Sequence, residues 1–112
     1  TLLLADQQDD KALTVYGNNI ASKYQDDAKG LNGYAWFWAE KGKNLVSAEA
    51  AARKSLELKE DANVWDTLSM VLWKQGKPAE AIAAEEKALQ LTDGKNEDFK
   101  QRISEIKADM QK

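Results

Sequence analysis

The sequence predicts an all-α fold built from helical hairpins that repeat along the chain, and two observations support this. Residues 31–42 and 65–76 share one order of large, small and glycine positions, with every position displaced by 34. Residues 53–58 return as residues 86–91 with a displacement of 33. A period near 34 residues is typical of stacked helix pairs, in which each pair buries its apolar face against its neighbour.

The predicted elements follow from apolar spacing and from capping residues. A first amphipathic helix is expected over residues 9–25, on a stripe formed by Leu13, Tyr16, Ile20 and Tyr24. Asp26 and Asp27 offer a cap for a second helix over residues 28–41, which Gly42 should end. A third helix over residues 45–59 completes the first hairpin.

Three residues mark where the helices of the second hairpin begin and end. Asp61 should cap a helix over residues 62–75, Gly76 should end it, and Pro78 suits the first turn of the next helix, which stops near residues 93–94. The side chains expected to be buried in this hairpin are Trp65, Leu68, Leu72, Ala81, Ile82, Ala88 and Leu89.

A last helix is expected over residues 96–111, with Asn96 as its cap. Its apolar stripe consists of Phe99, Ile103, Ile106 and Met110, and its opposite side is charged. Such a helix is suited to closing the open end of a stack of repeats. Small residues, such as Ala35, Ser69 and Ala81, are expected where two helices of one hairpin cross closely.

Composition excludes several classes of function. The chain of 112 residues contains no cysteine and no histidine, so zinc sites built on these residues, disulfides and histidine-dependent triads are excluded. Its net charge of −3, with basic residues spread along the chain, argues against nucleic acid as a partner. No apolar run approaches the ~18 residues of a membrane span, so no membrane insertion is expected.

Acidic pairs are the remaining candidates for acid–base chemistry. The pairs at residues 9–10, 26–27 and 85–86 are interpreted as helix caps and solvated faces rather than as catalytic groups. We therefore expect no enzyme activity, no catalytic residues, no metal and no cofactor.

The pattern over about residues 28–94 resembles the tetratricopeptide (TPR) repeat. The signature positions of the family are occupied in the second copy by Trp65, Leu68, Leu72, Gly76, Ala81 and Ala88. It departs from the family at Ser69, at Leu72, where an aromatic residue is usual, and at Glu85, where Phe or Tyr is usual. The resemblance implies a single TPR-like domain of two repeats, about residues 28–60 and 62–94, with flanking helices that include a C-terminal capping helix over about residues 96–111.

The resemblance also implies a scaffold that binds protein or peptide in a concave groove. The family's inner face maps onto Ala39 and Glu40 and onto the candidate partner-binding residues Lys29, Asn32, Trp36, Asn63, Asp66, Met70, Trp73 and Lys74. Trp36, Met70 and Trp73 are expected to form an aromatic–thioether patch. The alternative is that Trp36 and Trp73 are covered by another helix, by a further domain or by a second copy of the chain in a homodimer.

A second resemblance keeps another function open. Residues 31–36, 66–68 and 85–88 are similar to helical tails behind thioredoxin-like domains of some exported bacterial proteins. The chain has no Cys-x-x-Cys motif, so this similarity implies an architectural or dimerisation tail without redox activity. The chain starts at Thr1 without Met, so we expect a fragment of a longer protein. We expect it in the bacterial cytoplasm or periplasm, and the absence of cysteine does not distinguish these two compartments.

Overall fold

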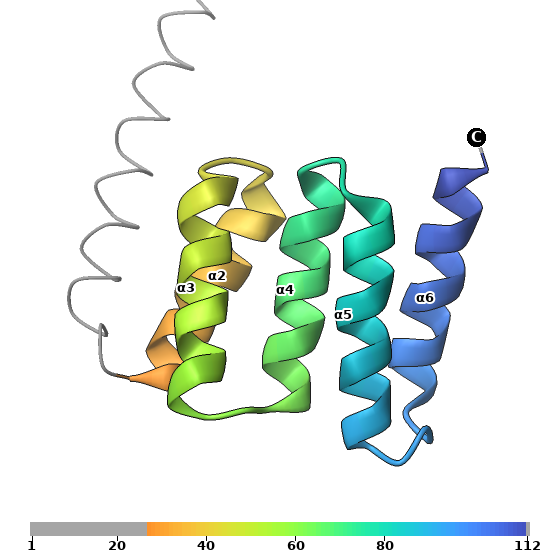
Figure 1. Ribbon diagram of the computed structural model, residues 1–112. Helices are drawn as coiled ribbons and strands as arrows, with labels where there is room; N and C mark the ends of the chain where they lie inside the picture. The colour runs from red at the N-terminus through yellow and green to blue at the C-terminus, as the bar shows by residue number, and fades with distance from the viewer. Residues whose placement is uncertain (1–26, 112) are drawn as a thin grey trace, which may run out of the picture.

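The protein is all-α throughout residues 27–111, which are the residues that the computed structural model describes. Five helices follow one another in this part of the chain (Figure 1): α2 (Ala28–Lys41), α3 (Leu45–Leu58), α4 (Ala62–Lys74), α5 (Pro78–Leu91) and α6 (Glu97–Met110). The all-α prediction is confirmed, and the predicted helix ends agree with these bounds to within a few residues. The predicted helix over residues 9–25 lies outside the described residues.

The two hairpins begin in the same way. The side chains of Asp27 and Asp61, which are 34 residues apart, each accept a hydrogen bond from the backbone N–H two residues later, at 3.0 and 2.7 Å. Each carboxylate thereby satisfies one of the free N–H groups of a helix start and places negative charge at the positive end of the helix dipole. Asn96 caps α6 through the N–H of Phe99, at 3.1 Å. All three predicted caps are confirmed.

The first helix of each hairpin also ends in the same way. Gly42 and Gly76 have φ angles of 68° and 80°, in the left-handed region that glycine adopts without a side-chain clash. The N–H of the residue after each glycine donates to the carbonyl of Trp38 or Leu72, at 3.3 and 3.0 Å. This bond closes the helix end and turns the chain towards the next helix. The 34-residue sequence period is therefore also a period of local structure.

The hairpins stack side by side. Within each hairpin the two helices pack extensively, α2 against α3 and α4 against α5. Helix α4 also contacts α2 and α3, and α5 contacts α6, so the second hairpin lies between the first hairpin and the last helix (Figure 1). The core consequently runs along the stack rather than around one centre.

Small residues occupy the close helix crossings, as predicted. Ala35, Ala48, Ala52, Ser69, Ala81 and Ala88 are all fully buried. The hydroxyl of Ser69 donates to the carbonyl of Ala81 at 2.7 Å, so this polar side chain is satisfied inside the crossing. The large buried residues Tyr34, Trp38, Leu68 and Leu72 belong to the same core.

Several residues that were predicted to be buried are only partly buried. The Trp65 side chain lines a pocket of about 410 Å³ between α3 and α5, and its indole N–H donates to Glu60 at 3.2 Å. Trp65 stays accessible because the second helices of the two hairpins do not close over it. Ile82 and Leu89 are also only partly buried.

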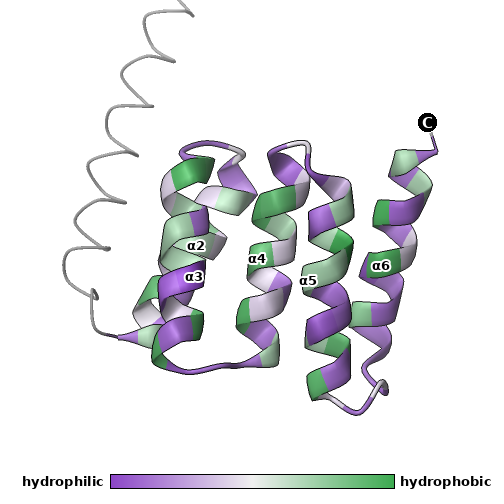
Figure 2. Cartoon of the chain, in the orientation of Figure 1, coloured by the Kyte–Doolittle hydropathy of each residue, from purple (hydrophilic) through white to green (hydrophobic). Residues whose placement is uncertain are grey.

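Helix α6 has the two-sided character expected of a capping helix. Figure 2 shows it as mostly hydrophilic, with hydrophobic turns recurring along its length. Phe99, Ile103 and Ile106 are buried, whereas Met110 is 50% exposed because it is the last residue of the helix. Three of the four stripe residues thus pack as predicted, and Met110 does not.

Replacing Ala81 with tryptophan should destabilise the protein strongly. Ala81 is fully buried at the α4–α5 crossing, where an indole would push the two helices apart and strain the Ser69 hydrogen bond. We expect a loss of about 1–3 kcal/mol or more in the free energy of unfolding, measured by urea denaturation. Ala79→Trp is the matched control, because Ala79 is exposed on the same helix. Equal stability of the two variants would show that the crossing lies elsewhere.

Candidate functional site

Four of the residues predicted to line a groove, Lys29, Asn32, Asn63 and Asp66, surround two neighbouring pockets on the α2, α4 and α6 side of the stack. Lys29, Asn32 and Asn63 line the first pocket, of about 170 Å³, between α2 and α4. Asn63 and Asp66 line the second pocket, of about 380 Å³, between α4 and α6. Because Asn63 lines both, we treat the two pockets as one surface and call it the inner groove.

The α2–α4 pocket carries amide and basic groups. Lys59 and Asp61 complete its polar lining beside Lys29, Asn32 and Asn63. The Oδ1 atom of Asn32 is buried and has no hydrogen-bond partner among the described residues. A buried acceptor without a donor is unfavourable, so the Asn32 side chain leaves an unmet hydrogen-bonding requirement beside this pocket.

The α4–α6 pocket is polar and acidic. Its lining includes the carboxylates of Asp66, Asp98 and Glu105 and one cation, the guanidinium of Arg102. Its other lining residues are Asn63, Asn96, Phe99 and Gln101. Gln101 donates to Glu105 at 3.2 Å and so holds this carboxylate in place on α6.

A cluster of ionisable side chains, formed by Asp66, Glu85 and Arg102, extends from the wall of the α4–α6 pocket into the core. Arg102 on α6 places Nη1 3.8 Å from Oδ1 of Asp66 on α4, and Nε 4.0 Å from Oε1 of Glu85 on α5. Glu85 is fully buried. The cluster therefore connects three helices through side chains that are far apart in the sequence.

Burial raises the pKa of Glu85 to about 9, and the hydrogen bond with Asp66 and its negative charge act in the same direction, while Arg102 opposes them. Glu85 consequently holds a proton at neutral pH and can donate it in a hydrogen bond to the Asp66 carboxylate.

The burial of Glu85 corrects the interpretation of residues 85–86 as a solvated acidic face. Glu86 is exposed as expected, but Glu85 faces inwards, so the interpretation is wrong for Glu85. The sequence held a signal for this, since Glu85 occupies a position at which the TPR pattern has an aromatic core residue. The burial of a carboxyl group at that position is explained by Asp66 and Arg102.

The remaining candidate groove residues do not line these two pockets. Trp73 packs against the core, and its indole N–H donates to Asp109 of α6 at 2.8 Å. Met70 lies against the core and receives a weak contact from Arg102, with Nη1 3.8 Å from its sulfur. Trp36 is partly buried and Lys74 is exposed. Ala39, which was expected on the inner face, is fully buried in the core, and that expectation was wrong.

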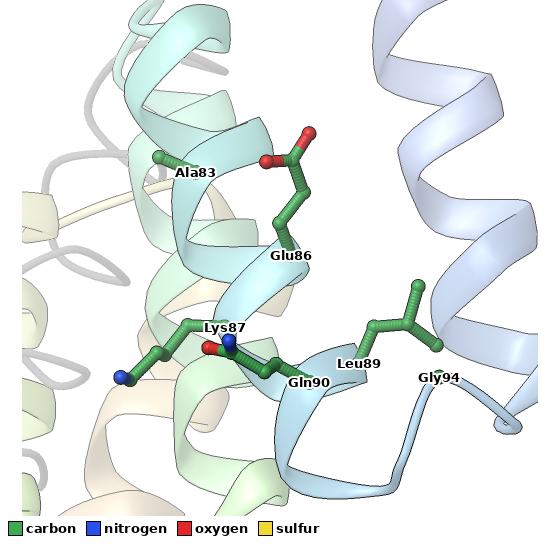
Figure 3. A pocket seen from close by; sticks show the side chains of 6 residues that line it. All are labelled: Ala83, Glu86, Lys87, Leu89, Gln90 and Gly94. Atoms are coloured by element: carbon green, nitrogen blue, oxygen red, sulfur yellow. The ribbon is translucent and has the colours of Figure 1, made fainter.

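A further hollow lies on α5, away from the inner groove. It has a volume of about 430 Å³ and is lined by Ala83, Glu86, Lys87, Leu89, Gln90 and Gly94. Figure 3 shows that these side chains point in different directions and do not converge on one position. Among them, Glu86, Lys87 and Gln90 are exposed, so this hollow offers no concentrated binding chemistry.

Residues 27–111 contain neither a candidate metal site nor a candidate membrane span. No cluster of three or more acidic side chains there is placed to ligate a metal ion. None of the helices in that range combines the length and apolar character needed to cross a membrane.

The fold and the groove define a class: an all-α protein of stacked helical hairpins with two neighbouring surface pockets. No model of a known protein family matches the chain, and no curated protein matches it either.

Proposed function

We propose that the chain is a TPR-like helical-repeat domain that binds a protein or an extended peptide in its inner groove and has no catalytic activity of its own. Two features support the TPR-like assignment. The hairpins repeat their caps at a spacing of 34 residues, at Asp27 and Asp61 and at Gly42 and Gly76. The first helix of the second hairpin also packs against the first helix of the first hairpin, which is the side-by-side arrangement of a repeat array.

The observation that carries the binding proposal is that two asparagine residues, Asn32 and Asn63, line one pocket. An extended peptide exposes backbone N–H and C=O groups at regular intervals, and an asparagine side chain can accept from one and donate to the other. Amide side chains on the first helices of the two hairpins thus suit the backbone of an extended segment rather than one particular side chain. The charged groups around them would then select the sequence of the partner.

Asn63→Ala tests this function, because Asn63 lines both pockets. Peptides would first be selected from a displayed random library by their binding to the intact chain. They should bind the variant about tenfold more weakly than the intact chain, as expected for the loss of a hydrogen bond in a binding site. The affinity would be measured by fluorescence polarisation. Glu86→Ala, in the hollow on α5, should leave it unchanged.

Two results would contradict the proposal. The first is that no peptide is enriched in the selection, and the second is that enriched peptides bind Asn63→Ala as well as they bind the unmodified chain. Thermal melts of both variants would separate a lost contact from a damaged fold.

A second candidate function, an architectural or dimerisation role within a larger protein, is favoured by one observation. Val46 is 80% exposed near the start of α3, which belongs to the first hairpin of the helices described in residues 27–111 (Figure 1). An exposed apolar side chain of this kind can contact a second copy or a neighbouring domain. A molecular mass that rises with concentration in sedimentation equilibrium, without any peptide response, would favour this role over the groove.

A further inference from the structure

Another pocket lies between the second helices of the two hairpins, α3 and α5. It has a volume of about 410 Å³ and shares no lining residue with the inner groove. Helix α3 packs mainly on α2 and α4, and α5 packs mainly on α4 and α6, so side chains of α4 reach the space between α3 and α5. The lining residues are Arg53 of α3, Trp65, Leu68 and Leu72 of α4, and Glu80, Ala83, Ala84 and Lys87 of α5.

Much of this α3–α5 pocket is apolar, and it includes one accessible aromatic ring. Leu68, Leu72 and Ala84 are buried side chains of the core, whereas Trp65 is only partly buried. The indole N–H of Trp65 donates to Glu60 at 3.2 Å, so the one polar group of the ring is already satisfied. Trp65 therefore offers a ligand apolar carbon surface, and covering this surface would be favourable.

Two cations lie at one end of the pocket. Helices α4 and α5 run antiparallel (Figure 1), so Lys87 near the end of α5 lies at the level of Trp65 near the start of α4. Arg53 lies at this level on α3, because the 33-residue displacement between the hairpins aligns it with the residue before Lys87. Glu80 precedes Lys87 by about 10 Å along the axis of α5 and so belongs to the other end of the pocket.

Both cations have donors left for a ligand. The ammonium group of Lys87 has no ion pair within residues 27–111, and Figure 3 shows this side chain extending from α5 on the side away from Glu86 and α6. Arg53 uses its Nε for Glu49, at 2.8 Å, which leaves the N–H groups of its two Nη atoms. Among the lining residues at this end, no carboxylate opposes the two cations. This end of the pocket is therefore complementary in charge to an acidic group.

We propose that the α3–α5 pocket is a docking site for an acidic amphipathic segment of a partner protein, which places a large apolar side chain against Trp65 and a carboxylate beside Lys87 and Arg53. The volume of about 410 Å³ accommodates such a side chain. Burial of the apolar group would supply most of the affinity, and the ion pairs would set the orientation of the segment. The inference does not rest on the function proposed for the inner groove, since it concerns other residues.

The test compares three small molecules of one shape that differ in charge: 4-phenylbutanoate, 4-phenylbutanamide and 4-phenylbutylammonium. In a saturable NMR titration of the full chain, 4-phenylbutanoate should shift the indole N–H signal of Trp65 and the backbone signals of Ala83 and Lys87. It should bind about fivefold more tightly than the amide, because two partly exposed ion pairs each contribute a modest amount. The ammonium compound should bind more weakly than the amide.

Two surface variants test the role of charge. Lys87→Gln should remove most of the preference for 4-phenylbutanoate over the amide, and Ala83→Glu should abolish it by adding a carboxylate to the wall. Both residues are exposed, so these changes should leave the fold intact. The matched control is Lys95→Gln, which removes one positive charge from an exposed position outside the pocket and should have little effect at physiological salt.

The partner segment itself is tested with displayed peptides. Peptides that the chain enriches and that 4-phenylbutanoate displaces should carry Asp or Glu beside an aromatic residue or leucine. They should bind Lys87→Gln about threefold more weakly than the unmodified chain, as expected for the loss of one exposed ion pair. Asn63→Ala, which alters the inner groove, should leave their affinity unchanged, so the two sites are judged separately.

Three results would overturn the inference. The first is equal binding of the three small molecules, and the second is a loss in Lys95→Gln as large as the loss in Lys87→Gln. The third is a molecular mass that rises with concentration and falls when 4-phenylbutanoate is added, which would show that a second copy of the chain occupies the pocket. Failure of Asn63→Ala to weaken peptides of the inner groove would contradict the groove function and leave this site standing.

Discussion

Replacing Glu85 with glutamine should stabilise the protein at alkaline pH and remove most of the pH dependence of its stability above pH 5. Glu85 is fully buried, and burial together with the neighbouring Asp66 raises its pKa to about 9, from an ordinary value of 4.5. A glutamine of the same shape can donate its amide N–H to Asp66, as the protonated carboxyl does, without ever becoming charged.

The sign of the effect follows from proton binding. Between about pH 4.5 and pH 9 the folded protein keeps the proton on Glu85, while the unfolded chain releases it. Fewer protons are then bound in the unfolded state, so the free energy of unfolding falls as pH rises through this window. The stability associated with protonated Glu85 is fully present below pH 4.5 and is lost as pH approaches 9. Because Arg102 opposes the rise, it limits the size of this loss.

Urea denaturation at pH 5, 7 and 9 measures the difference between the two proteins. The Glu85→Gln variant should match the unmodified chain at pH 5 and exceed it at pH 9 by on the order of 3 kcal/mol or more, since each pKa unit corresponds to ~1.4 kcal/mol. Glu86→Gln is the control, because Glu86 is the exposed neighbour on the same helix. An unmodified chain whose stability rises from pH 5 to pH 9 would show that Glu85 is ionised in the folded state.

The parts of the fold that sequence analysis predicted correctly depend on short-range physics. Asp61 caps α4 through an N–H two residues away, and Gly76 ends it through a backbone conformation of its own. The small residue Ala81 permits a close crossing within one hairpin. Each of these effects involves residues that are neighbours in sequence or on adjacent helices, so the period and residue types alone predict them.

The parts that could not be predicted depend on contacts among three helices. The Asp66–Glu85–Arg102 cluster forms only when α4, α5 and α6 are all in place. A carboxyl group on a helix is predicted to be exposed to solvent unless its distant partners are known. For this reason Glu85 was assigned to the surface. Trp65 shows the reverse case, since its accessibility depends on how far apart α3 and α5 lie.

The second large effect is expected at Trp73, whose replacement with alanine should destabilise the protein by about 3 kcal/mol. Its ring packs against the core and its indole N–H donates to Asp109 at 2.8 Å, so it fastens α6 to α4. The sequence is compatible with two positions of this residue: an open groove side chain, whose loss would spare stability, or a ring covered by another helix. The contact with α6 favours the second, and the melting temperature should therefore fall.

Two matched variants separate the contributions of the ring and of its hydrogen bond. Trp73→Phe keeps most of the apolar contact and loses the N–H donor, so it should cost about 1 kcal/mol. Trp36→Ala removes an indole from α2 that is only partly buried and lies outside the packed core cluster, and it should cost less than Trp73→Ala. Free energies of unfolding for the three variants would come from urea denaturation followed by circular dichroism. If Trp73→Ala unfolds like the unmodified chain while peptide binding weakens, Trp73 belongs to the groove, and α6 must be held in place by Phe99, Ile103 and Ile106 alone.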